Sequence, residues 1–263
     1  MKKKSNILIL ILLIILLLVF LFAGYKLYSI VHEYRIAQRA YNRLSNQFVS
    51  TNTSQPSTDP AHTETPDGVY IDPEISPIQV DFDALLSISQ DVVGWLYSPN
   101  TVIDYPVAQS EDNDYYLHRL YDGKYNPSGT LFIDFRCAHD FSDRNTILYG
   151  HHMNDGSMLA SIVEYSKAGY YEQHPYLYLN TPSGNYRVEL FSGFVTAAGS
   201  TAFTLDLDED DAFDLYIKKM QGFSDFESDV EVGLDDKLLT LVTCTYEYTD
   251  ARYVLLGKLV RIH

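Results

Sequence analysis

Residues 239–257, LTLVTCTYEYTDARYVLLG, place a cysteine and an arginine at the facing ends of two strand-like runs. The first run ends on Cys244, a short polar loop follows, and Arg252 opens the second run. Apolar, β-branched and aromatic residues bounded by a turn-like segment are typical of two strands joined by a loop. If these strands pair, we expect both side chains to lie on one rim of a sheet.

The rest of the chain carries more short runs of the same kind. We predict strands over residues 129–135, 146–149, 176–180, 186–197, 238–243 and 253–262. Residues 81–97 predict a short helix, a turn at Gly94 and a strand, and the proline in 101–109 suits an edge strand or a bulge. Helices are predicted over 158–165 and 210–220, the second with its acids at the N-terminal end. Many short strands with few helices predict a mainly β fold, a closed or nearly closed barrel.

The N-terminal segment has a different character. Three lysines, at positions 2 to 4, precede an unbroken apolar run over 7–23, which is long enough to approach the roughly 20 residues that cross a bilayer. A cleavable signal peptide is the alternative, but its apolar region is shorter and ends in a small-residue cleavage site that is missing here. We therefore predict a single-pass anchor over 1–25, with the N-terminus cytoplasmic and the remainder outside the membrane.

Three further segments follow the anchor. Residues 26–49 place apolar side chains at steps of three and four, which predicts an amphipathic helix. Residues 50–79 are rich in Ser, Thr, Pro and Asp without periodicity, which predicts a flexible linker. The globular domain is then expected over 80–263.

Charge and cysteine content narrow the possible functions. Residues 1–50 hold seven Lys or Arg and one acid, which leaves 12 basic and 34 acidic residues beyond them, a net charge of −22. Such an acidic exterior disfavours nucleic acid and anionic lipid surfaces as partners. The two cysteines, Cys137 and Cys244, do not make a disulfide scaffold, and no C-x-x-C pattern indicates a metal site.

Cys244 is the candidate nucleophile of the chain. A thiolate is the reactive form of cysteine, and a neighbouring guanidinium can stabilise the oxyanion that forms when a thiolate attacks a carbonyl. Simpler interpretations stay open for both residues. Cys244 could be a small buried apolar residue, and Arg252 could be a solvated cation paired with Asp250 or Glu247.

A cysteine nucleophile usually needs a histidine, and His151 and His152 are the best placed. The strand predicted at 146–149 ends at Gly150, and His151 and His152 follow at the expected rim. The other histidines lie in the N-terminal helix, the linker, loops or the C-terminus: His32, His62, His118, His139, His174 and His263.

Metal-binding patterns fail. The adjacent histidines do not match H-E-x-x-H. The acidic run from Asp206 has Asp211 where a calcium loop needs glycine and Ile217 where it needs glutamate. We therefore predict no metal and no cofactor.

The motif TLVTC followed by Arg252 resembles the T-L-x-T-C…R signature of sortases, the membrane-anchored cysteine transpeptidases of Gram-positive bacteria. NTILYGHHM resembles the segment that carries their catalytic histidine, and His151 stands in its place. The helix after the anchor and the segments DVVGWLY, IDYPVAQ, DNDYYL and GTLFIDFR are similar to class B sortases in particular. The resemblance covers nearly the whole chain. It implies a closed eight-stranded sortase-type β-barrel with peripheral helices.

The resemblance also implies a mechanism. Cys244 would attack the backbone carbonyl of a Thr in the C-terminal sorting motif of a secreted protein and form a thioester. His151 would act as general acid and base, and Arg252 with the backbone N–H of Thr245 would hold the oxyanion. An amine, typically of a peptidoglycan precursor stem peptide, would then take the acyl group.

By position, the resemblance implies that Asn113, Leu117 and Tyr149 line the substrate groove. Cys137 is predicted to be an unpaired bystander, because a disulfide to Cys244 would remove the nucleophile. Three alternatives stay open. They are a pilin-polymerising sortase, a cysteine hydrolase of the same fold with water as acceptor, and a non-enzymatic surface-binding domain in which Cys244 is structural.

Overall fold

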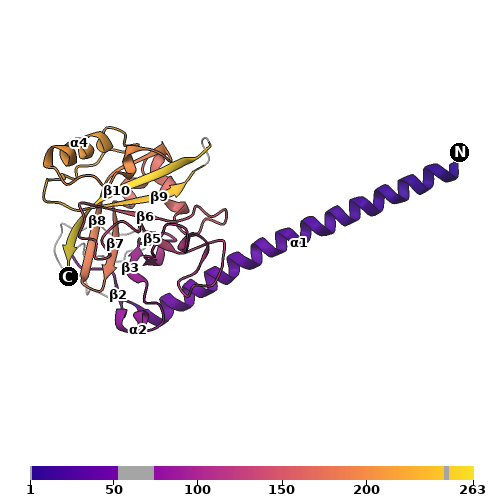
Figure 1. Cartoon of the computed structure of the whole chain (residues 1–263), viewed down its shortest axis with the longest axis horizontal. Helices are drawn as coiled ribbons and strands as arrows, with labels where there is room; N and C mark the ends of the chain where they lie inside the picture. Colours follow the sequence, from indigo (N-terminus) through magenta and orange to yellow (C-terminus); the bar gives the residue numbers. More distant parts are fainter. Residues whose placement is uncertain (1, 53–73, 246–248) are drawn as a thin grey trace.

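A computed structural model describes residues 2–52, 74–245 and 249–263. Figure 1 shows a β-rich body from which one long helix extends. The helices are α1 (Lys2–Phe48), α2 (Phe82–Leu86), α3 (Tyr170–Gln173) and α4 (Asp210–Gln221), with 3₁₀ segments η1 (Tyr116–His118), η2 (Ala160–Ser166) and η3 (Thr201–Phe203). The strands are β1 (Val49–Thr51), β2 (Ile78–Val80), β3 (Val92–Tyr97), β4 (Asp104–Ala108), β5 (Leu131–Ile133), β6 (Asn145–Tyr149), β7 (Tyr176–Thr181), β8 (Gly184–Ala197), β9 (Leu238–Cys244) and β10 (Ala251–Ile262).

Eight strands of the described chain close into a barrel in the order β10-β8-β7-β3-β4-β5-β6-β9. The β4–β5 and β6–β9 pairs are parallel and the other neighbours are antiparallel. Each barrel strand sends at least one fully buried side chain into a common core: Leu96, Val107, Leu131, Leu148, Leu179, Leu190, Leu241 and Leu255. Fully burying each such side chain is worth about 1.5–3 kcal/mol, so this core is the main stabilising element of the barrel. The predicted mainly β, closed eight-stranded barrel with peripheral helices is confirmed.

The N-terminal helix is continuous from Lys2 to Phe48, so the predicted anchor and the amphipathic segment form one element. An 18-residue stretch of its apolar part has a mean hydropathy of 2.8, and none of these residues is buried. Its last turns pack on the barrel through the buried side chains of Tyr41, Leu44 and Phe48. The helix therefore combines a stretch apolar and long enough to cross a membrane with an end that docks on the folded domain.

The predicted linker, 50–79, has structure at both of its ends, and its middle, 53–73, lies outside the described residues. β1 pairs with β2 in antiparallel register, with Thr51 opposite Ile78. The carbonyl of Glu74 accepts the backbone N–H of His263 at 3.1 Å. The folded domain thus extends back to residue 74, earlier than the predicted start at 80.

Gly94 lies inside β3 and does not form the predicted turn. The register of β3 against β4 shifts between Val92 and Gly94. A Cβ atom at Gly94 would lie 3.1 Å from the carbonyl oxygen of Asn180 and 3.4 Å from the ring of Phe141. A close approach of neighbouring chain, rather than a change of direction, explains this glycine.

Two boundaries and the position of one strand in the sheet also differ from the sequence predictions. The helix predicted over 158–165 is the 3₁₀ segment η2, which starts later because Met158 has a positive φ of 59°. The strand predicted over 129–135 shortens to β5, because the chain turns at Asp134, whose carbonyl accepts the N–H of Cys137 at 2.9 Å. β4 is paired on both sides rather than an edge, and its proline is tolerated because pairing with β5 begins only at Val107.

Candidate active site

Cys244 and Arg252 are directly opposite each other in the antiparallel ladder of β9 and β10. The next pair along is hydrogen-bonded, since the N–H of Thr245 donates to the carbonyl of Ala251 at 3.1 Å. Cys244 and Arg252 therefore form a non-hydrogen-bonded pair, in which Cα atoms are about 4.5 Å apart and both side chains project from the same face. The predicted placement of both residues on one rim follows from this register.

His151 reaches the same rim through the parallel pairing of β6 with β9. Tyr149 is the register partner of Val242. His151 is two residues beyond Tyr149, and Cys244 is two residues beyond Val242. The two chains therefore arrive at this end of the barrel in step.

Three hydrogen bonds fasten the two chain ends together beyond the strand ladder. The N–H of Gly150 donates to the carbonyl of Val242 at 3.1 Å, and Oγ1 of Thr243 donates to the carbonyl of Gly150 at 2.8 Å. Nδ1 of His152 lies 3.0 Å from the carbonyl oxygen of Cys244. Because a carbonyl only accepts, this nitrogen carries the hydrogen, and His152 holds the backbone of the candidate nucleophile. No role was predicted for His152 from the sequence.

The ring of His151 is held by main chain rather than by a carboxylate. Its Nε2 atom lies 2.7 Å from the carbonyl oxygen of Leu117, so Nε2 carries a hydrogen and Nδ1 is the nitrogen free to exchange a proton. The ring of His118 stacks on that of His151, with centroids 5.6 Å apart and planes at 18°. Burial lowers the pKa of His151, the Leu117 carbonyl raises it, and His118 lowers it again, so that the pKa lies below its ordinary value of 6.5.

The three predicted substrate-groove residues lie near one another, and Asp134 connects two of them. Nδ2 of Asn113 donates to Oδ2 of Asp134 at 3.0 Å, and the hydroxyl of Tyr149 donates to the same oxygen at 3.1 Å. Leu117 belongs to η1, whose main chain holds His151. Sequence reasoning missed Asp134, although a single acid after the apolar run TLFI was a visible signal.

Both predicted oxyanion donors are engaged in the structure. Nη1 of Arg252 donates to the carbonyl of Ala251 at 3.0 Å, and the N–H of Thr245 donates to the same oxygen. Both donors are thus occupied by the Ala251 carbonyl, and each would have to exchange it for a substrate oxygen. The alternative partner Glu247 lies outside the described residues.

Cys137 differs from Cys244 in its surroundings. Both are free thiols, but Cys137 is buried, with its Sγ 3.9 Å from the carbonyl of Asn145. Burial raises the pKa of Cys137 to about 11, so it stays a thiol at neutral pH. Within the described residues, no group of three or more His, Cys, Asp or Glu side chains is placed to hold a metal ion.

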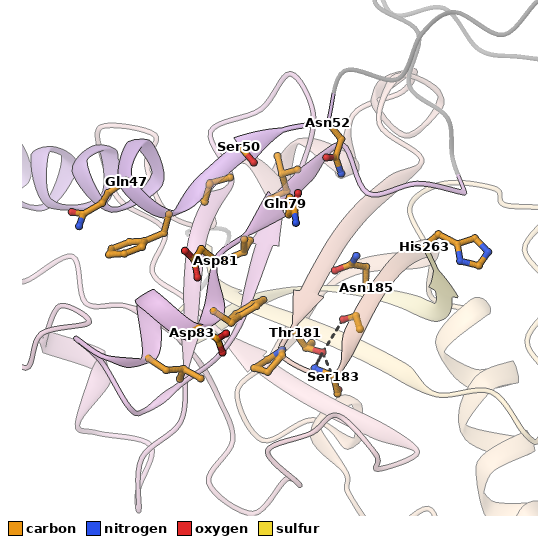
Figure 2. A pocket seen from close by; sticks show the side chains of 18 of the residues that line it. Gln47, Ser50, Asn52, Gln79, Asp81, Asp83, Thr181, Ser183, Asn185 and His263 are labelled. Atoms are coloured by element: carbon orange, nitrogen blue, oxygen red, sulfur yellow. Dashed lines mark hydrogen bonds between the residues drawn. The ribbon is translucent and has the colours of Figure 1, made fainter.

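A groove of about 1130 Å³ lies at the other end of the barrel (Figure 2). β10 runs from Arg252 at the candidate site to Ile262, and this groove includes the C-terminal His263. Its other walls are the end of α1, β1, β2, α2 and the turn between β7 and β8. Asp81 in this groove caps α2 by accepting the N–H of Ala84 at 3.0 Å. The groove is thus separate from the candidate active site.

Comparison with known proteins gives a consistent result. No protein-family model matches the chain. The chain is 35% identical to sortase B of Listeria monocytogenes over 92% of its own length and 92% of that protein. Sortase B from Bacillus anthracis in complex with AAEK1 has a TM-score of 0.72 and 30% identity, and the match covers 88% of this chain and 100% of that one. The Staphylococcus aureus sortase B–substrate complex has a TM-score of 0.66 and 31% identity over 69% of this chain and 85% of that one.

The fold, the order of the motifs and the extent of these matches agree. The barrel carries TLVTC on β9, Arg252 on β10 and GHHM after β6, the arrangement on which the sequence resemblance rested. The identity to a curated relative extends over more than nine-tenths of both chains. The chain belongs to the sortase B family of transpeptidases.

Proposed function

We propose that this chain is a cysteine transpeptidase that cleaves the C-terminal sorting motif of secreted proteins after Thr and transfers them to an amine. The observation that carries the proposal is the pairing of Cys244 with Arg252 across β9 and β10, with His151 brought to the same rim by β6. A nucleophile, a proton carrier and a fixed cation at one rim are what acyl transfer requires.

In the first half-reaction, Nδ1 of His151 takes the proton of the Cys244 thiol, and Sγ of Cys244 bonds to the carbonyl carbon of the motif Thr. The oxyanion forms against the guanidinium of Arg252 and the N–H of Thr245, whose shared acceptor is the carbonyl of Ala251. As the carbon–nitrogen bond breaks, His151 protonates the leaving amine from Nδ1, the nitrogen that the Leu117 carbonyl leaves free.

In the second half-reaction, His151 accepts a proton from the incoming amine, which attacks the thioester and releases Cys244. The acceptor is a peptidoglycan stem-peptide amine, with a pilin amine and water as the alternatives. A solved relative, sortase B of S. aureus, is a complex with substrate, which supports substrate binding by this fold. Thioester breakdown measured with and without an added amine separates transfer from hydrolysis.

We further propose that α1 anchors the enzyme with its N-terminus in the cytoplasm and the barrel outside. An unburied stretch with a mean hydropathy of 2.8 and lysines at positions 2 to 4 support this topology. Protease added to intact cells should digest the barrel but spare an epitope placed at the N-terminus. Digestion of the epitope instead would reverse the orientation.

The test of the activity is a peptide-library cleavage assay with the full chain in detergent. Cys244→Ala, His151→Ala and Arg252→Ala should each abolish transfer of the cleaved peptide to an added amine. Undiminished transfer by Cys244→Ala would disprove the cysteine mechanism.

A further inference from the structure

Asp134 is a buried carboxylate at the centre of five hydrogen bonds. Its side chain is 0% exposed. Oδ1 accepts the backbone N–H and Nε of Arg136, at 3.1 and 2.8 Å, and Oδ2 accepts Nη2 of Arg136 at 2.8 Å. Oδ2 also accepts Nδ2 of Asn113 at 3.0 Å and the hydroxyl of Tyr149 at 3.1 Å. Such saturation is what a carboxylate needs to remain ionised out of water.

The bonds connect segments that are distant in sequence. Asn113 precedes η1, Tyr149 ends β6, and Asp134 follows β5. Asn113 returns a bond through its Oδ1, which accepts the N–H of Phe135 at 3.1 Å. Gln109 adds a further tie by donating Nε2 to the carbonyl of Asp134 at 3.1 Å. The carboxylate therefore fixes the relative position of two loops and a strand end.

The charge balance of this network favours a rigid arrangement. Burial alone would raise the pKa of Asp134, but the hydrogen bonds from Arg136 and Asn113 outweigh it, and the pKa lies below its ordinary value. Arg136 supplies the countercharge while its own side chain remains 53% exposed. Asp134 therefore stays an acceptor at neutral pH, with its donors held in one geometry.

Both side-chain donors other than Arg136 are candidate groove residues. Asn113 and Tyr149 approach Oδ2 from different segments, so neither can reorient without releasing the same atom. Tyr149 is also two residues from His151, and Asn113 precedes the η1 turn whose carbonyl holds the His151 ring. The carboxylate is thus placed to hold the wall of the groove that lies beside the catalytic rim.

We propose that Asp134 is a positioning residue of the peptide groove, which holds Asn113 and Tyr149 as one wall and so determines which sorting motifs are accepted. The proposal rests on the function proposed above. It assigns Asp134 no contact with the reacting atoms. Its effect should appear in substrate affinity and selectivity rather than in the reactivity of the thiol.

The variant that tests this is Asp134→Asn in the full chain in detergent. The Asn side chain is similar in size to that of Asp. Its NH₂ group is itself a donor, so in either orientation it faces the donors that bind the Asp134 carboxylate and cannot accept from them. The matched control is Asp104→Asn, because Asp104 also accepts two side-chain donors, Nε1 of Trp95 and Oγ of Ser45, both at 2.7 Å, but connects α1 to the barrel. Tyr149→Phe removes one donor and keeps the ring.

Three readouts are compared for the wild type and these variants. Hydrogen exchange reports the opening of residues 111–119. A library of peptides with one varied motif position at a time reports KM, kcat and selectivity. Alkylation by iodoacetamide reports the reactivity of Cys244.

For Asp134→Asn, we expect exchange over 111–119 to be at least about tenfold faster and KM about tenfold higher, the effect of losing one bond to a charged group. Selectivity should flatten, and the alkylation rate should stay within about twofold. Tyr149→Phe should show a smaller change of the same kind, and Asp104→Asn should show none of these changes.

The outcomes separate the proposals. Unchanged exchange over 111–119, or faster exchange with unchanged KM and selectivity, would overturn the role of Asp134. A fall in kcat and alkylation rate with unchanged KM would also overturn it, since that pattern means damage to the catalytic rim. If the wild type cleaves no library peptide, the function proposed above fails, and the exchange data alone decide whether Asp134 holds the two segments together.

Discussion

The Nε2 atom of His151 lies 2.7 Å from the carbonyl oxygen of Leu117, which therefore does the orienting that a carboxylate does in many catalytic triads. A neutral carbonyl fixes the ring and its tautomer but adds no full negative charge to stabilise an imidazolium. This explains why burial is the largest influence on the pKa of His151 and keeps it below 6.5. Most of the enzyme therefore holds a neutral His151 at neutral pH.

The first prediction concerns this pKa. His118 lowers the pKa of His151, so His118→Ala should raise it and shift the acid limb of the kcat/KM profile to higher pH. NMR titration of the His151 ring should show the same shift. A pKa that stays unchanged or falls would contradict the role given to the stacked ring.

A related prediction concerns stability. Folding lowers the pKa of His151. Its contribution to the free energy of unfolding is therefore fully present above about pH 6.5 and is lost as the pH falls through the pKa of the folded state. The pKa of His174 is also lowered, chiefly by burial, and works in the same direction. Urea denaturation should therefore show a fall in free energy of unfolding below about pH 6.5 that is smaller in His174→Gln. An equal fall in this variant would exclude a contribution from His174.

Gly150 should be intolerant of a side chain. A Cβ atom there would lie 2.4 Å from Cδ2 of Leu131 and 2.7 Å from Cγ of Leu159, and both leucines are fully buried. Gly150→Ala should cost about 1–3 kcal/mol of stability by overpacking and should lower kcat/KM by displacing His151. Gly199→Ala is the control, since nothing lies within 4 Å of its Cβ position. Equal unfolding midpoints in urea for the two variants would refute the packing argument.

Arg252→Lys should show that the guanidinium is needed for its shape as well as its charge. An ammonium cannot reproduce the fixed fork of donors, so we expect kcat/KM to fall by about 10²–10³ with little change in stability. Arg144→Lys, on an ion pair with the exposed Asp210, provides a comparison that should leave activity unchanged. Near wild-type turnover in Arg252→Lys would show that only the positive charge at this position is needed, and not the shape of the guanidinium.

The two cysteines should separate cleanly in a labelling experiment. Native protein should take up one equivalent of iodoacetamide, at Cys244, and denatured protein should take up two, because the Cys137 thiol is buried with a pKa of about 11. Cys137→Ala should keep full transfer activity. Mass spectrometry of the alkylated peptides identifies the site, and early labelling of Cys137 would show that its surroundings open readily.

Much of this arrangement could be predicted from the sequence because strand ends carry local signals. Apolar runs that stop at Cys244 and at Gly150 mark rims, and a barrel brings such rims together. The role of Asp134 could not be predicted in this way, because its partners Asn113 and Tyr149 come from distant segments. The position of Gly94 inside β3 could not be predicted either, because the residues that approach it, Asn180 and Phe141, are distant in sequence. The Leu117 carbonyl that binds His151 could not be predicted either, because every residue has a main-chain carbonyl whatever its side chain.

The uninterrupted helix α1 determines the distance between the proposed membrane anchor and the barrel. In the proposed topology the helix leaves the bilayer near Gly24 and first meets the folded domain at Glu33, whose carbonyl and carboxylate accept Nδ2 of Asn126. At 1.5 Å per residue the free part of the helix is about 14 Å long. In that topology, the proposed substrates and acceptors would meet the active site at a fixed distance from the membrane.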